Sequence, residues 1–216
     1  MLKKILDVIL FGSLFISFCA VALCIETNIL LHLKLNSVSF YLFVFGATLV
    51  QYNLHYLFKK SAVKYSERLA WSLKNKLTHK VLIWLGIALI IISLFSFQLH
   101  QFIILSVLGA IALLYSFPLL PFARKKRIKD YGLLKILTLA LMWTLVTVWF
   151  PVDEANYSFS YHLILIRRFI FIFILCLLFD IRDTEIDRAE NISTLSVKLG
   201  VKRAYILCYT LLILFA

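Results

Sequence analysis

Long apolar runs separated by short polar connections dominate the pattern of the chain. A membrane-spanning helix needs about 20 mostly apolar residues. Six runs have this character, and they cover residues 5–25, 38–58, 81–97, 101–120, 132–150 and 161–180. A seventh run begins near Ala204 and reaches Ala216. The pattern predicts an all-α fold, a polytopic membrane helical bundle with about seven spans, built as a single domain over residues 1–216.

The two ends of this pattern carry their own expectations. In an α-helix the seventh run extends over about 20 Å, which is shorter than the ~30 Å hydrocarbon core of a bilayer. We therefore expect the intact protein to continue beyond Ala216. The first run is too long for a cleavable signal peptide, and no small-residue cleavage site follows it.

The composition agrees with a membrane protein. Apolar residues make up 62% of the chain and charged residues 16%, with a mean hydropathy of +0.94. A soluble domain is about half apolar and a quarter charged, so these values exclude a soluble enzyme and a disordered chain. The four cysteines lie in or beside apolar runs without a CxxC pair, which favours small core residues over a metal or redox site.

The basic residues alternate between connections. The formal net charge is +12, and 19 of the 23 Lys and Arg precede the first run or follow the second, fourth and sixth runs. The positive-inside rule then places the N-terminus and these connections in the cytoplasm of a multi-pass protein of the cell membrane. Lipid headgroups account for such charges, so we expect the bilayer as a partner and no nucleic acid.

Five of the 11 acidic residues gather at the end of the sixth run. Asp180, Asp183 and Asp187 are spaced i, i+3 and i+7, which on one helix places them within an arc of about 60°. Carboxylates this close repel one another, so a positive group should face them. Mg²⁺ prefers oxygen ligands and is commonly shared with substrate phosphates. Alternatively, Arg182 and Arg188 neutralise a solvated helix end.

The segment that contains these acids resembles a known motif. From Asp180 to Gly200 it reads DIRDTEIDRAENISTLSVKLG. This resembles the second aspartate-rich motif of the UbiA-type intramembrane prenyltransferases, DxxDxxxD followed by a short basic stretch and Thr-Leu-x-Val-x-Leu-Gly. Asn191 stands where a glycine is usual, and Ser196 where a proline is usual. The spacing of the runs also resembles the family along the whole chain.

The resemblance implies a fold and a chemistry. Members of the family look like a ring of nine helices around a cavity open sideways to lipid. They transfer an isoprenyl group from its diphosphate to an acceptor, often aromatic, with Mg²⁺ as cofactor. Asp180, Asp183 and Asp187 would then be the catalytic and metal-ligating residues. The metal would take up charge on the leaving diphosphate while a carbocation-like prenyl group forms in a dry cavity.

The first aspartate motif of the family, Asn-Asp-x-x-Asp-x-x-x-Asp, should lie at the end of the second run. The chain keeps only its asparagine, Asn53, which is a candidate for substrate binding, and the aspartate positions hold Leu54, Leu57 and Ser61. Lys60 is a candidate to contact the diphosphate in place of a metal. Alternatively, it flanks the span at the lipid interface.

Three further basic residues are candidates for substrate binding. Arg124 and Lys125 lie in the basic loop after the fourth run, where arginine can make bidentate contacts with phosphate oxygens. The same loop also serves membrane orientation. Lys135 lies just inside the fifth run, where it either contacts substrate or extends its ammonium to the interface.

Together these residues predict a membrane prenyltransferase that binds Mg²⁺, an isoprenyl diphosphate and an unidentified acceptor, aromatic or another lipid precursor. An alternative is a non-catalytic relative that binds an isoprenoid lipid or diphosphate, which the incomplete first motif favours. A small transporter fits less well, because the acids lie at a membrane edge and no pair of helices is broken by glycine or proline.

Overall fold

The structure is a computed structural model that describes residues 2–57, 67–116, 132–189 and 193–215. Every regular element in these ranges is a helix, which confirms the all-α prediction. The chain divides into two compact units, Met1–Leu99 and His100–Ala216. Each unit is described by itself, and the single domain over residues 1–216 stays a prediction.

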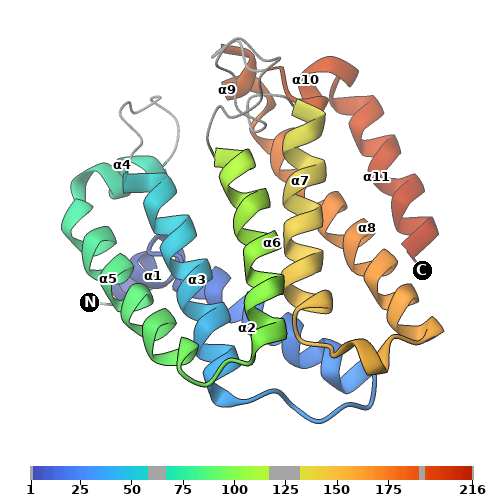
Figure 1. Cartoon of the computed structure of the whole chain (residues 1–216). Helices are drawn as coiled ribbons and strands as arrows, with labels where there is room; N and C mark the ends of the chain where they lie inside the picture. The colour runs from blue at the N-terminus through green and yellow to red at the C-terminus, as the bar shows by residue number, and fades with distance from the viewer. Residues whose placement is uncertain (1, 58–66, 117–131, 190–192, 216) are drawn as a thin grey trace. The chain divides into compact units, whose positions relative to one another are not determined.

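The first unit is a group of five helices (Figure 1). They are α1 (Leu2–Phe11), α2 (Leu14–Leu30), α3 (Val38–Leu57), α4 (Glu67–Lys74) and α5 (Lys76–Leu94). Helix α3 packs along α5 and also against α2, and the short α4 joins the ends of α3 and α5. The core of this unit contains buried side chains from α2 and α3, including Ala20, Phe40 and Leu49.

Two glycines bring the backbones of α3 and α5 together. A Cβ atom at Gly46 would lie 2.7 Å from the carbonyl oxygen of Gly86, and one at Gly86 would lie 2.8 Å from that of Gly46. Only residues without a side chain fit such an approach, which is a common packing mode of membrane helices. The apolar pattern alone did not reveal this pairing.

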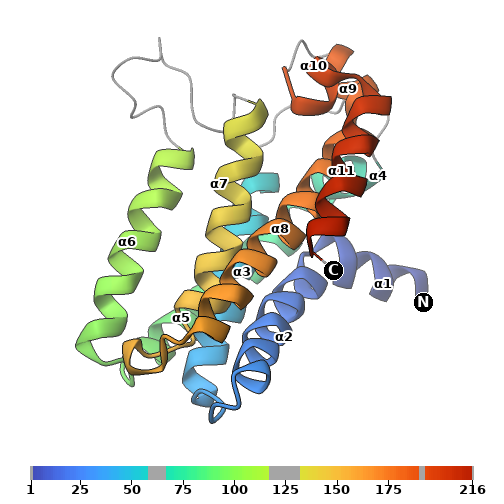
Figure 2. The same cartoon turned by 90° about the vertical axis from the view of Figure 1, so that its right-hand side faces the viewer.

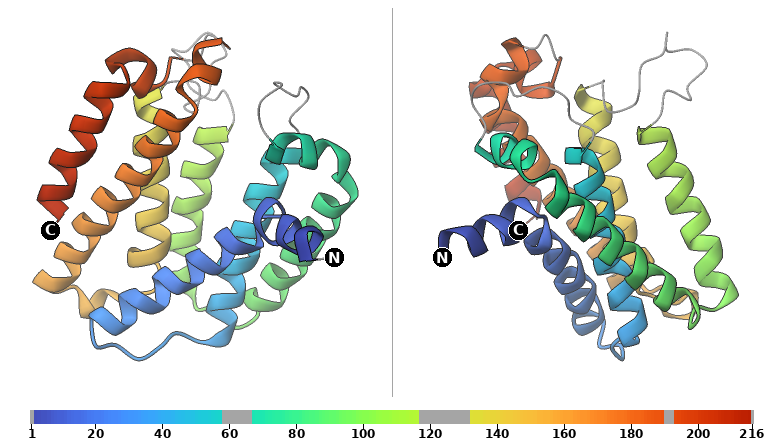
Figure 3. Two further views of the ribbon diagram at one scale, coloured as in Figure 1. Left: turned by 180° about the vertical axis from the view of Figure 1, so that it is seen from behind. Right: turned by 90° about the vertical axis from the view of Figure 1, so that its left-hand side faces the viewer.

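The first apolar run, predicted as a span over residues 5–25, is not one straight helix but two helices that meet at a bend. Helices α1 and α2 meet at an angle of 57°, with the break at Gly12 and Ser13 (Figure 3). Ser13 has a φ of 66°, in the left-handed region, so the helix cannot continue through it. The run is apolar on both sides of the break, so hydropathy alone could not show it.

The second unit contains the remaining helices. They are α6 (Leu99–Ser116), α7 (Gly132–Thr144), the π-helical turn η2 (Leu145–Trp149), the 3₁₀ turn η3 (Glu154–Asn156), α8 (Phe159–Arg182), α9 (Thr184–Ala189), α10 (Leu195–Leu199) and α11 (Val201–Phe215). Helix α8 lies between α7 and α11 (Figures 1 and 2). Their contact forms a core of six buried residues: Ile136, Ile174, Leu177, Ile181, Ala204 and Cys208.

Within the described residues, a helix lies in every predicted run, but fewer of these helices qualify as spans. Among the described residues, α5 and the stretch Gly132–Trp149 are long and apolar enough to cross a membrane. The bent pair α1 and α2 counts as a third if it forms one span. In the described part of the chain, two or three stretches therefore meet this test of length and composition, and the number of about seven spans stays a prediction.

Candidate functional site

The acidic segment lies at one end of the second unit. The last turn of α8, the short helices α9 and α10 and the first turn of α7 all meet there (Figure 1). Close packing fixes this arrangement, because a Cβ at Gly132 would lie 2.6 Å from the Cα of Thr194. The start of α7 is thereby held against the segment that follows α9.

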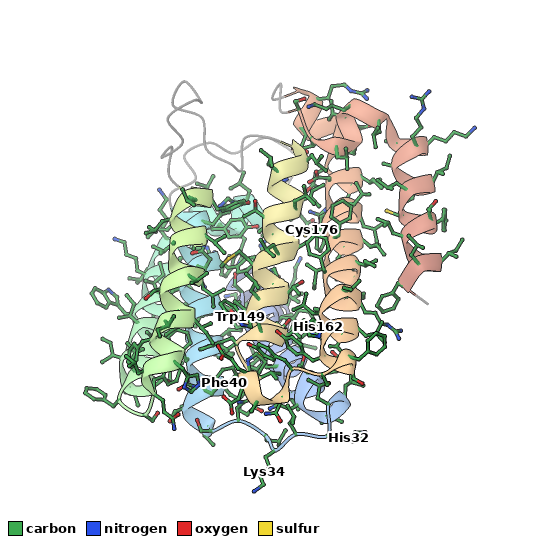
Figure 4. The ribbon with its side chains drawn as sticks, turned by 45° about the vertical axis from the view of Figure 1, so that its right-hand side comes forward. His32, Lys34, Phe40, Trp149, His162 and Cys176 are labelled. Atoms are coloured by element: carbon green, nitrogen blue, oxygen red, sulfur yellow. The ribbon has the colours of Figure 1, made fainter. Side chains whose placement is uncertain are left out.

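Asp180 is the most buried acid of the cluster and is paired with Lys135. The Lys135 Nζ lies 2.8 Å from the Asp180 Oδ1, and the exposed fractions of the two side chains are 30% and 4%. Cys176, one helical turn before Asp180, lies beside α7 (Figure 4). The contact between Lys135 and Asp180 joins α7 and α8, and the two residues are 45 positions apart in the sequence. Lys135 is therefore a positive group of the kind that the sequence led us to expect opposite the acids.

Buried hydroxyl groups hold the backbone around Asp180. The Ser196 Oγ donates to the Asp180 carbonyl oxygen at 2.8 Å, and the Thr184 Oγ1 lies 3.0 Å from the same oxygen. The Thr184 and Ser196 hydroxyls are themselves 2.8 Å apart. Ser196, which stands where the resembled motif usually has a proline, therefore ties α10 to the end of α8. Sequence reasoning missed this role.

The three aspartates do not lie on one continuous helix, which corrects the expected geometry. Helix α8 ends at Arg182, Asp183 is the cap residue with φ −93° and ψ 6°, and α9 begins at Thr184. The Asp183 carboxylate accepts two hydrogen bonds of 2.8 Å from the Arg182 guanidinium. The alternative interpretation, in which Arg182 and Arg188 neutralise the acids, therefore holds in part, because Arg182 pairs with Asp183.

Asp187 faces the same group of charges as Asp180. Burial raises the pKa of the Asp187 carboxyl; the Lys135 charge acts against this rise, and the Asp180 charge adds to it. A hydrogen bond with the Thr194 side chain favours the ionised form. The Oδ2 atoms of Asp180 and Asp187 are both buried and have no hydrogen-bond partner among the described residues.

These two oxygens decide whether a metal fits. No group of three or more His, Cys, Asp or Glu converges as a metal site in the described part of the chain. Mg²⁺, however, is usually bound by one or two carboxylates together with water and substrate phosphates. Asp180 and Asp187 each offer a buried oxygen without a partner, which is costly unless a cation or donor satisfies it. The donor set therefore fits a partly protein-bound Mg²⁺.

The side-chain amide of Asn53, in the first unit, has hydrogen-bond partners at both its nitrogen and its oxygen. Its side chain is buried, and its Nδ2 donates to the Gly12 carbonyl at 3.0 Å and to the Leu49 carbonyl at 2.8 Å. Its Oδ1 lies 2.6 Å from the His79 Nδ1. Asn53 thereby satisfies the carbonyl freed by the break before α2. Within this unit the residue acts as a connector between α3, α5 and that break.

The remaining candidates have different outcomes. Lys60, Arg124 and Lys125 lie outside the described residues. Arg168 is buried and lies 3.4 Å from the Thr147 Oγ1, and the Arg167 guanidinium lies over the Phe215 ring. Both arginines, which lie in the sixth apolar run, thus have structural contacts within the second unit.

The comparison with known families identifies the chain. Residues 72–216 match the model of the UbiA prenyltransferase family, which is more than half of the chain. This protein belongs to the UbiA prenyltransferase family. No curated protein and no solved structure gives a match. The family consists of membrane prenyltransferases, which agrees with the apolar helices described above.

The UbiA match covers the two aspartate regions unequally. It includes the whole second unit, with Lys135 and the segment from Asp180 to Gly200. It begins after Asn53, so the stretch expected to hold the first aspartate motif lies outside it. The family assignment therefore rests on the part of the chain that carries the buried aspartates.

Proposed function

We propose that this UbiA member is a membrane enzyme that transfers an isoprenyl group from its diphosphate to an acceptor molecule, with Mg²⁺ at the end of α8. One observation carries the proposal. Asp180 and Asp187 present two buried carboxylate oxygens without partners, within the segment that resembles the family's aspartate motif. Asp183, more exposed and paired with Arg182, would be the third and weaker ligand.

Different side chains of the site would have different roles in binding. Asp180 and Asp187 would hold the cation, and the hydroxyls of Thr184 and Ser196 keep the Asp180 backbone in place. When bound, Mg²⁺ neutralises charge on the departing diphosphate. Lys135 would add a second positive charge toward the diphosphate. The reacting prenyl group would need surroundings that exclude water.

The charge distribution supports an orientation in the membrane. In the second unit α9 and α10, which contain basic residues, lie at the C-terminal end of α8, where Asp180 is located (Figure 1), whereas Asp153 and Glu154 precede its N-terminal end. The positive-inside rule makes the aspartate end cytoplasmic. The same rule predicts that Lys60, Arg124 and Lys125 lie in cytoplasmic connections, from which they would attract the anionic diphosphate.

A non-catalytic isoprenoid-binding relative is the second candidate. The observation that favours it is that the Asn53 side-chain amide already forms hydrogen bonds with Gly12, Leu49 and His79. A second metal of the family type has no carboxylates at positions 54, 57 and 61. Such a protein would bind a prenyl diphosphate at the Asp180 site without turning it over.

Pyrophosphate release separates the two candidates. The purified protein in detergent is incubated with geranyl, farnesyl or geranylgeranyl diphosphate, Mg²⁺ and a panel of aromatic acceptors. Mg²⁺-dependent release of pyrophosphate that disappears in Asp180→Asn supports the enzyme. Binding of a prenyl diphosphate without release supports the non-catalytic relative. Absence of both contradicts the proposed function.

A further inference from the structure

The cluster at the end of α8 already contains a cation of its own. The Lys135 ammonium touches Asp180 at 2.8 Å, and its charge also acts on Asp187. The Asp183 charge also acts on Asp187, but least among these charges, and its carboxylate accepts two hydrogen bonds from Arg182. The buried Asp180 and the half-buried Asp187 thus share one ammonium, which leaves a site that is only partly neutralised.

The two members of the ion pair differ in their freedom to move. Asp180 is 4% exposed, and hydroxyls of Thr184 and Ser196 hold its carbonyl. Lys135 is 30% exposed and carries its charge on a flexible four-carbon stem. When a ligand enters, the ammonium is therefore the partner that can turn away, while the carboxylate stays in place.

We propose that Lys135 is a resident counter-ion that makes the site take Mg²⁺ and diphosphate together rather than Mg²⁺ alone. This inference rests on the proposed function and specifies how its site selects the ligand. Bare Mg²⁺ must share Asp180 with an ammonium that repels it. A bound diphosphate removes this conflict, because its negative charge attracts both cations and gives Lys135 new oxygens to contact.

The proposal predicts opposite effects of one substitution on two ligands. Lys135→Gln keeps an N–H donor but removes the charge. We expect the variant to bind Mn²⁺ alone, as a paramagnetic stand-in for Mg²⁺, at least tenfold more tightly than the parent protein. We expect it to bind inorganic pyrophosphate, at saturating Mg²⁺, at least tenfold more weakly. Lys202→Gln removes the same charge from an exposed position at the start of α11 and should change neither affinity.

A second measurement uses the unaltered protein and does not depend on how the variant folds. An amine-reactive reagent is applied with no ligand, with Mg²⁺ alone, and with Mg²⁺ plus pyrophosphate, and labelling of each lysine is measured by mass spectrometry. Saturating Mg²⁺ alone should release Lys135 and increase its labelling. Adding pyrophosphate should reduce it again. Lys202 labelling should stay constant.

The outcomes separate this inference from the proposed function. Equal Mn²⁺ affinity in the parent and a folded Lys135→Gln variant, or Lys135 labelling that ignores both ligands, overturns the counter-ion role. The proposed function survives that result if the parent still binds a prenyl diphosphate with Mg²⁺. Conversely, a Lys135-dependent Mn²⁺ affinity without any prenyl diphosphate binding supports the counter-ion and removes the prenyltransferase.

Discussion

The Asp180 carboxylate and the Lys135 ammonium form one ion pair, but the two side chains differ in their exposure to water. The acid is nearly inaccessible, whereas almost a third of the lysine side chain is exposed. Loss of the lysine would leave a buried charge without its partner, which costs more than the pair itself contributes. Loss of the acid would leave a lysine that can reach water along its flexible stem.

This asymmetry predicts unequal effects on stability. Lys135→Ala should lower the free energy of unfolding by about 3 kcal/mol, which is the lower end of the range for breaking a buried ion pair. Asp180→Ala should lower it less, and the double variant should recover part of the loss caused by Lys135→Ala. Thermal unfolding in detergent measures all three. A double variant less stable than either single variant would show that the pair is not the cause.

At the scale of helices, the contact between α3 and α5 depends on two glycines. A methyl group at Gly46 would press on the Gly86 carbonyl, which is backbone and cannot turn aside. We expect Gly46→Ala to destabilise the protein by about 1–3 kcal/mol, the usual cost of overpacking. Gly109→Ala in α6 is the matched control, because a Cβ there meets no atom within 4 Å.

The control has its own expected sign. Alanine is favoured over glycine inside a helix by about 1 kcal/mol, so Gly109→Ala should be neutral or slightly stabilising. The temperature of unfolding, followed by circular dichroism in detergent, distinguishes the two glycines. If both variants unfold at the parent temperature, α3 and α5 do not require this close approach.

The helices themselves were largely predictable, and their breaks were not. Apolar runs predicted helices near α3, α5, α7 and α8, because a buried or lipid-facing helix needs such runs. The break after Phe11 and the break at Asp183 have no proline to announce them. Both depend on hydrogen bonds from distant residues, such as the one from Asn53 to the Gly12 carbonyl.

The candidate site shows the same limit. The sequence named Asp180, Asp183 and Asp187 from their spacing and named Lys135 from its unusual place in an apolar run. It did not join Lys135 to Asp180, since that contact depends on how α7 packs against α8. The spacing also gave no reason to distinguish the three acids. In the structure Asp180 and Asp187 each have a buried oxygen without a partner, whereas Asp183 pairs with Arg182.

At the scale of the whole molecule, the alternation of basic connections predicts one orientation. The connections 59–80, 121–131 and 181–203 should all be cytoplasmic. Single cysteines placed in each, in a variant without the four native cysteines, should resist an impermeant thiol reagent in intact cells. They should react after the membrane is opened. Labelling of the 181–203 connection from outside would contradict this topology.

The central claim is that the aspartates at the end of α8 bind Mg²⁺ and a prenyl diphosphate. Titration of the purified protein with a prenyl diphosphate, with and without Mg²⁺, tests it most directly. The parent should bind only with Mg²⁺, and Asp187→Asn should weaken binding at least tenfold, about 1.4 kcal/mol. Asp183→Asn should weaken it less, because Arg182 already occupies that carboxylate. The exposed Glu185, changed to Gln, should have no effect. Binding that does not need Mg²⁺, or an Asp187→Asn variant that binds as tightly as the parent, would contradict the account.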